Sequence, residues 1–203
     1  MTAAARRGAV IVALAMAGAL ATAGVPLAAA STDLPGAGSV ELAFTPGDAI
    51  DARIAAAIDA AEHEVLVLAF AFTQQRIARA LVAAHARGVA VEVVADRGQT
   101  LETPHSAVPT LVTAGVPVWL DGNFAAAHNK VVIVDAGLAR ATTVTGSYNF
   151  TTAAQRRNAE NVAIFRDNAG VAQAYRAYFK RLQARAQRWE RAADAAPARR
   201  PRR

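Results

Sequence analysis

The chain has 203 residues and no cysteine, which excludes a disulfide scaffold, thiol catalysis and a cysteine-based metal site. Its formal net charge is +6, but nine of its 22 Lys and Arg residues lie within residues 180–203. Residues 31–179 carry 11 basic and 14 acidic residues. The positive charge therefore belongs to the C-terminal end, and the body of the chain is not a basic protein.

The first 30 residues have the pattern of a secretory signal peptide. Arg6 and Arg7 precede an apolar stretch over residues 9–20, and residues 28–30 are alanines that suit a cleavage site. The apolar stretch is shorter than a membrane-spanning helix requires. We therefore expect a periplasmic or secreted protein, cleaved near Ala30, with no stable membrane span after cleavage. The arginine pair gives only a hint of the twin-arginine export route.

Strands and helices alternate along the rest of the chain. Apolar runs predict strands over residues 40–44, 65–72, 89–96, 116–120 and 160–165, and two further β-runs over residues 130–135 and 140–147 flank a short turn. Helices are predicted between the first two strands, over residues 74–87, around 107–114 and from 167 to about 188. Thr73 and Gly88 are the expected caps of the second helix. Residues 31–189 are thus expected to form one α/β domain, with a mixed, largely parallel β-sheet flanked by helices on both faces.

The last residues, 190–203, end in the sequence ARRPRR and are expected to form a basic, disordered tail. Two interpretations of this tail stay open. It is either a solvated end without a function of its own, or an arm that attracts phosphate groups without regard to their sequence.

Two short polar pairs interrupt the apolar strands. His128 and Lys130 are two residues apart at the start of one β-run, and Ser147 and Asn149 are two residues apart at the end of the next. Side chains at i and i+2 of a strand point to the same side, and Gly146 allows the backbone to come close to a bound group. An imidazole, an ammonium, a hydroxyl and an amide are the groups that a phosphoryl centre requires.

Two acidic residues accompany these pairs. Asp135 ends the strand that His128 begins, so we expect it to stabilise a loop or a neighbouring strand rather than to contact substrate. Glu160 begins a later strand and is a candidate to orient the imidazole by accepting its second N–H. The other histidines, His63, His85 and His105, have no comparable neighbours and are interpreted as structural or surface residues.

The segments HNKVVIVD, residues 128–135, and GSYN, residues 146–149, resemble the HKD signature of the phospholipase D superfamily. The resemblance extends from about Phe44 to about Trp189 and is strongest to the small bacterial endonucleases that carry one motif per chain. One difference is visible: ten residues separate Asp135 from Gly146, where the family usually has six. A longer hairpin explains this difference, and it leaves the motif residues intact but puts the shape of the loop in question.

The resemblance implies a mechanism. His128 would attack phosphorus and form a phosphohistidine that water then hydrolyses, while Lys130 and Asn149 hold the non-bridging oxygens. Ser147 would donate a further hydrogen bond, and Glu160 matches the acidic residue that orients the histidine. No metal or other cofactor is implied, because the lysine and the amide compensate the charge.

The mechanism also needs a general acid for the leaving oxygen. Family members normally provide it from a second motif, and this chain has only one. A homodimer with its active site at the two-fold interface would bring two copies of His128 face to face. We therefore expect a homodimer, and an inactive monomer.

The motif is compatible with three functions. The leading hypothesis is an exported, metal-independent and non-specific endonuclease that hydrolyses DNA or RNA, with Arg97, Arg156 and Arg157 as candidate contacts to backbone phosphates. A phospholipase D that acts on phospholipid head groups is the first alternative. A non-catalytic nucleic-acid-binding protein is the second, and the completeness of the motif argues against it.

Overall fold

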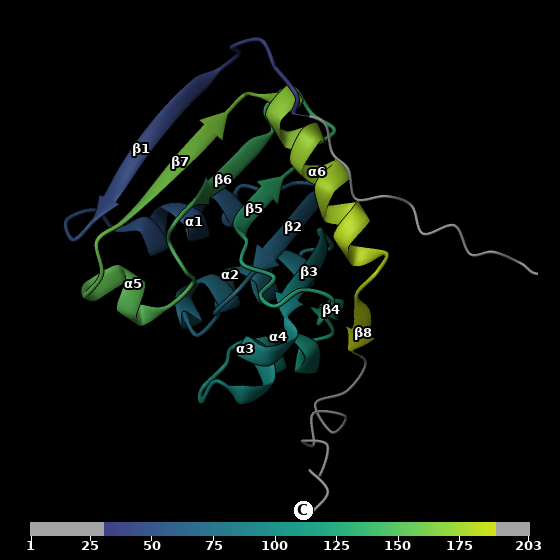
Figure 1. The fold of residues 1–203 in the computed structure, drawn as a ribbon. Coiled ribbons are helices and arrows are strands. Elements are labelled where there is room, and N and C mark those ends of the chain that lie inside the picture. The colour runs from purple at the N-terminus through teal and green to yellow at the C-terminus, as the bar shows by residue number, and fades with distance from the viewer. Residues whose placement is uncertain (1–30, 190–203) are drawn as a thin grey trace, which may run out of the picture. The chain divides into compact units, whose positions relative to one another are not determined.

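The computed structural model describes residues 31–189, which form eight strands and six helices (Figure 1). The predictions of a signal peptide over residues 1–30 and of a tail over residues 190–203 lie outside the described residues. In chain order the elements are β1 (Ser39–Thr45), α1 (Ile50–Asp59), β2 (Glu64–Ala69), α2 (Gln75–Ala86), β3 (Ala90–Asp96), α3 (Arg97–Glu102), α4 (Val108–Thr113), β4 (Val118–Asp121), β5 (Lys130–Val134), β6 (Thr142–Gly146), α5 (Thr152–Arg156), β7 (Glu160–Arg166), α6 (Ala169–Gln183) and β8 (Gln187–Trp189). No helix within residues 31–189 is long and apolar enough to cross a membrane.

The strands form a single sheet in the order β1-β7-β6-β5-β2-β3-β4-β8. The mixed sheet is confirmed, but it is not largely parallel: within residues 31–189 only β2 with β3 and β3 with β4 pair in parallel. The chain reverses between β5 and β6 through a turn that is too short for the crossover a parallel pair needs. The edge strands β1 and β8, and β7 next to β1, also pair antiparallel with their neighbours.

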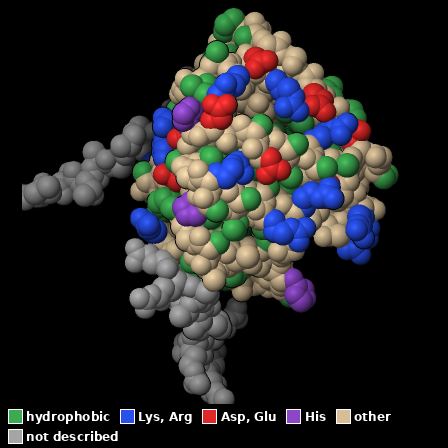
Figure 2. Space-filling view, turned by 180° about the vertical axis from the view of Figure 1, so that it is seen from behind, with side chains coloured by type: hydrophobic (Ala, Val, Ile, Leu, Met, Phe, Trp, Pro, Cys, Tyr) green, Lys and Arg blue, Asp and Glu red, His purple; other side chains and the backbone are tan. Residues whose placement is uncertain are grey.

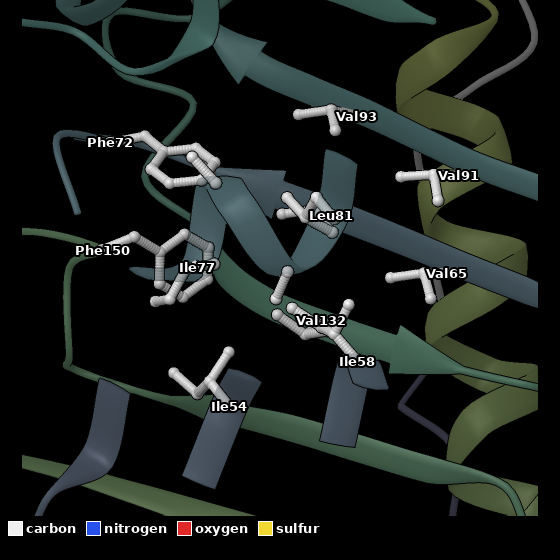
Figure 3. Packing of buried hydrophobic residues seen from close by; sticks show 14 of the residues in the cluster. Ile54, Ile58, Val65, Phe72, Ile77, Leu81, Val91, Val93, Val132 and Phe150 are labelled. Atoms are coloured by element: carbon white, nitrogen blue, oxygen red, sulfur yellow. The ribbon is translucent and has the colours of Figure 1, made fainter. Parts of the chain in front are cut away.

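Each face of the sheet packs against helices, as expected. One core lies between the sheet and α1, α2 and α4, where strand residues such as Val65 and Val132 meet Ile54, Ile77 and Leu81 (Figure 3). The alternate strand residues form a second core under α6, which consists mainly of Leu66, Leu68, Val94, Val131, Ile133, Phe179 and Leu182. The continuous apolar runs in β2 and β5 therefore reflect burial on both faces.

The α6 face of the sheet is only partly covered. Helix α6 lies over the middle of the sheet, whereas β1 and β7 are left open on that side (Figure 1). In β1, Ala43 is buried against the opposite core, and the residues that alternate with it, Val40, Leu42 and Phe44, are 54%, 61% and 54% exposed. We call Val40, Leu42 and Phe44 the β1 apolar stripe. Such a row of large apolar side chains on a sheet face marks a surface that is suited to a partner.

Several element boundaries differ from the sequence prediction. Thr73 does not cap α2 with its side chain; the backbone N–H groups of Thr73 and Gln74 both donate to the carbonyl oxygen of Phe150. Gly88 does follow α2 with a φ of 91°, as predicted. The last helix ends at Gln183 rather than near residue 188, because the chain leaves it to pair β8 with β4. The short helices α3 and α5 were not predicted, since each spans little more than one turn and shows no periodicity.

Candidate active site

The motif residues gather at one edge of the sheet because of the strand directions. Strand β5 is antiparallel to both β2 and β6, so the start of β5 lies beside the ends of its two neighbours. Strand β7 is antiparallel to β6 and begins at the same edge. We call this side of the sheet, where β2 and β6 end and β5 and β7 begin, the catalytic edge. It brings together His128 and Lys130, the loop after β6, and Glu160.

His128 and Lys130 differ in their exposure. His128 lies in the loop just before β5 and is exposed, whereas Lys130 is only 6% exposed and donates from Nζ to the carbonyl oxygen of His128 at 3.0 Å. Burial lowers the pKa of the Lys130 ammonium, and the carboxylate of Glu160 opposes this shift. The buried cation is thus fixed next to the backbone of His128, where it can compensate the charge of a phosphoryl group.

An aromatic ring that the sequence analysis did not single out supports both residues. Phe70 follows β2 and lies edge-on to the His128 imidazole, with the ring centroids 4.5 Å apart. The Nζ atom of Lys130 is 4.9 Å from the centroid of the same ring. Phe70 could be found only by pairing β2 with β5, because it lies 58 positions before His128 in the chain.

Ser147 and Glu160 form a small hydrogen-bonded group on the other side of the site. Ser147 Oγ donates to Glu160 Oε2 at 2.6 Å and accepts the backbone N–H of Asn161 at 3.1 Å. Asn158 Nδ2 donates to the second carboxylate oxygen of Glu160 at 2.9 Å. Within one chain, Glu160 is therefore held by Ser147 and Asn158, and the hydrogen bonds of the described residues do not join it to His128.

The loop that carries Asn149 is anchored to the start of α1 by hydrogen bonds through Gln155. Its neighbour Tyr148 is fully buried and donates to Gln155 Oε1 at 3.1 Å, and the same oxygen accepts the backbone N–H of Asp51 at the start of α1. Gly146 has to be glycine, since a Cβ there would collide with the carbonyl oxygen of Asn161. Among the described residues, the buried Oδ1 of Asn149 has no hydrogen-bond partner, so this oxygen can accept a hydrogen bond from a ligand, whereas only the Nδ2 group of the same amide can donate to a phosphate oxygen.

Asp135 lies at the opposite edge of the sheet from His128, as expected from its place at the end of β5. Its carboxylate accepts the backbone N–H groups of Glu62, His63 and Glu64 at 3.0, 2.8 and 2.9 Å. It thereby ties the end of β5 to the start of β2. The longer hairpin after Asp135 turns at this same edge, so the extra residues lie away from the site and β5 and β6 stay paired.

We expect Asp135→Asn to destabilise the fold by about 2–4 kcal/mol and to leave kcat per folded molecule nearly unchanged. Asparagine keeps the shape of the side chain but can accept with only one oxygen, so at least one partly buried N–H loses its partner. Denaturant unfolding measures the first effect, and phosphodiesterase kinetics below the melting transition measure the second. A large fall in kcat without a loss of stability would show that Asp135 acts in the site.

Sequence comparison gives the family of this chain. A family model described as "Cardiolipin synthase, PLD-like domain" matches residues 54–183, which include every motif residue discussed above. The chain belongs to the phospholipase D family. It is 38% identical over 136 residues to "Phospholipase D" of Rickettsia bellii, a match that covers 67% of this chain and 65% of that protein.

More distant members of the family include "Mitochondrial cardiolipin hydrolase" of Xenopus laevis, which is 32% identical over 135 residues, covering 66% of this chain and 61% of that protein. The matches to these curated relatives therefore span a little under two thirds of their length. Among solved structures, the phospholipase D family member Nuc from Salmonella typhimurium superimposes with a TM-score of 0.68 at 30% identity, covering 74% of this chain and 97% of Nuc. NucT from Helicobacter pylori has the same fold, with a TM-score of 0.65 at 22% identity, covering 74% of this chain and 99% of NucT.

The three arginines that were proposed to bind substrate all lie on elements that leave the catalytic edge. Arg97 begins α3 directly after β3 and its side chain lies against Gly122, while Arg156 and Arg157 end α5. All three are exposed. Viewed from the face that α1, α2 and α4 cover, Lys and Arg side chains are concentrated on the side where α5 lies (Figure 2).

Proposed function

We propose that this member of the phospholipase D family is an exported phosphodiesterase, and that His128 is its nucleophile. The observation that carries the proposal is the convergence of His128, Lys130, Ser147 and Asn149 at one edge of the sheet. An imidazole nitrogen attacks phosphorus and forms a P–N bond as the P–O bond to the leaving group breaks. Water then attacks the phosphohistidine, the P–N bond breaks, and the free imidazole is restored.

The neighbouring groups stabilise the charge that develops on the non-bridging oxygens. Lys130 supplies a positive charge at a fixed position, since its ammonium is buried and bonded to the carbonyl oxygen of His128. Asn149 supplies a neutral hydrogen bond from its amide Nδ2, and Ser147 adds a second one only when its hydroxyl turns from Glu160 to the phosphate. With these groups in place, the proposed mechanism needs no metal ion, and its charge compensation comes from the chain itself.

The leaving oxygen needs a proton, and we propose that the His128 of a second subunit supplies it. The β1 apolar stripe supports a two-fold dimer, because it is exposed and continuous with the site. Phe44 is paired in register with Asn161, whose backbone N–H binds Ser147. A partner that covers the stripe would therefore also lie beside the catalytic edge, so that each histidine would face the other subunit.

Nucleic acid is the substrate that we favour. The exposed arginines of α3 and α5 lie on either side of His128 along the catalytic edge, since α3 follows β3 and α5 joins β6 to β7. This arrangement suits the repeated phosphates of a polynucleotide. The second candidate is a phospholipid, which is favoured by the 38% identity to a protein named phospholipase D. It has one phosphodiester group to bind and gains less from several separated arginines.

Incubation of the purified protein with plasmid DNA, with RNA and with phosphatidylcholine vesicles, each in excess EDTA, tests this proposal. We expect cleavage of nucleic acid that EDTA does not reduce. Choline release without nucleic-acid cleavage would instead assign the protein to the phospholipases. Nuclease activity that EDTA abolishes and Mg²⁺ restores would contradict the metal-independent mechanism.

A further inference from the structure

The segment that carries His128 crosses the catalytic edge without regular secondary structure. It leaves β4 after Asp121 and enters β5 at Lys130, and in the sheet β3 and β2 lie between these two strands. Three strand spacings correspond to about 14 Å. The segment 122–129 must therefore pass over the end of β3, and the residue at that end is Asp96.

Asp96 is placed to fix this segment beside the histidine. Its side chain is buried, with 6% exposure, and its Oδ2 accepts the backbone N–H of Ala127 at 2.9 Å. Its Oδ1 accepts the backbone N–H of Gln99 at 2.8 Å and so caps α3. One carboxylate thus joins the end of β3, the start of α3 and the residue just before His128.

Other contacts hold the segment less closely to the histidine. Asp121, which is paired in register with Asp96, accepts the N–H of Asn123 at 3.0 Å, at the beginning of the segment. Phe124, Ala125 and Ala126 are exposed, and the chain becomes buried again only at Ala127. The hydrogen bonds of the described residues include none to the His128 imidazole, so the direction of this ring depends on its backbone and on the contact with Phe70.

We propose that Asp96 is a positioning residue for the His128 nucleophile. This inference rests on the proposed function of His128 and adds a residue outside the motif. A nucleophile must lie within a narrow range of distance and angle from phosphorus, and a displacement of about 1 Å can reduce the rate about 100-fold. By holding the N–H of Ala127, Asp96 limits the positions that the imidazole can take while contributing nothing to substrate affinity.

Asp96→Ser separates the two roles of this carboxylate. Serine is a good N-cap and can still accept the N–H of Gln99, but its single, shorter side-chain oxygen cannot also reach Ala127. With bis(p-nitrophenyl) phosphate as a minimal diester, we expect kcat to fall about 10- to 100-fold and KM to change less than about twofold. Asp96→Asn keeps two polar side-chain atoms but only one acceptor. Its kcat is expected to lie between those of Asp96→Ser and the wild type.

The matched control is Asp121→Ser, which makes the same change at the register partner, only 1% exposed. We expect its kcat to stay within about threefold of wild type, although its melting temperature falls at least as far. A wild-type kcat in Asp96→Ser, or an equal fall of kcat in Asp121→Ser, would overturn the positioning role alone. A wild-type protein that cleaves neither this diester nor DNA would overturn the proposed function as well.

Discussion

Replacement of His128 by alanine is expected to reduce kcat for phosphodiester hydrolysis by at least about 10⁴-fold, because the covalent intermediate can no longer form. The fold should be unaffected. His128 is exposed and lies outside the strands, so the free energy of unfolding should change by less than about 0.5 kcal/mol. Release of p-nitrophenol from bis(p-nitrophenyl) phosphate measures the activity, and thermal unfolding measures the stability of the same samples.

The matched control for this variant is His63→Ala. His63 is also an exposed histidine next to a strand, but it precedes β2 at the edge of the sheet where Asp135 lies. We expect wild-type kcat in this variant. A His128→Ala protein that keeps more than about a tenth of the wild-type kcat would show that another group attacks phosphorus, whereas equal losses in both variants would point to a damaged fold.

Trapping of the intermediate gives a second readout of the same prediction. Acid-labile phosphate should become attached to the wild-type protein during turnover of a labelled diester and should be absent from His128→Ala. The proposed attack places the label on the imidazole itself, so its position distinguishes a nucleophile from a histidine that only transfers protons.

Most of the fold could be predicted from the sequence because its signals are local. The apolar run of residues 65–72 and the four-residue spacing of Ile50, Ile54 and Ile58 each record burial along one element, and both elements form. Strand direction is a different kind of information. Strands β1 and β8 are the first and last strands of the sheet, and each pairs with a strand more than 60 residues away in the chain. The sequence pattern therefore could not reveal that most of the sheet is antiparallel.

The site could be predicted only where several of its residues lie close together in the sequence. His128, Lys130, Ser147 and Asn149 occupy two short segments, and their i, i+2 spacing was visible in the sequence. Phe70 and Asp96 come from the ends of β2 and β3 and reach the site only because both strands end at the edge of the sheet where β5 begins. An apolar residue just after a strand and an aspartate at the end of a strand are ordinary on their own, so no local signal could have identified them.

Replacement of Leu42 by aspartate, in the β1 apolar stripe, is expected to convert the proposed dimer into a monomer. Leu42 is the most exposed of the three stripe residues, at 61%, and lies between Val40 and Phe44. A two-fold dimer contains two copies of the substitution, so the loss of two buried leucine side chains would cost about 3–6 kcal/mol. This corresponds to a dissociation constant that is about 10²- to 10⁴-fold weaker.

Light scattering of the variant measures its mass, and the diester assay measures its kcat. If the leaving oxygen takes its proton from the His128 of a second subunit, kcat should fall together with the dimer and should recover partly at high protein concentration. Leu34→Asp is the matched control, because Leu34 is an exposed leucine, at 39%, that precedes β1 and lies outside the stripe. It should remain dimeric and active.

The two readouts separate the dimer from its catalytic role. A monomeric Leu42→Asp protein with wild-type kcat would show that the stripe joins the subunits but that each site is complete within one chain. If the Leu42→Asp protein stays dimeric, the dimer interface does not include the β1 apolar stripe. A concentration-dependent kcat, with loss of activity at the same concentration as loss of the dimer, is the result that requires a group from the partner. Since one chain contributes only one motif histidine to the catalytic edge, that group would be the second imidazole.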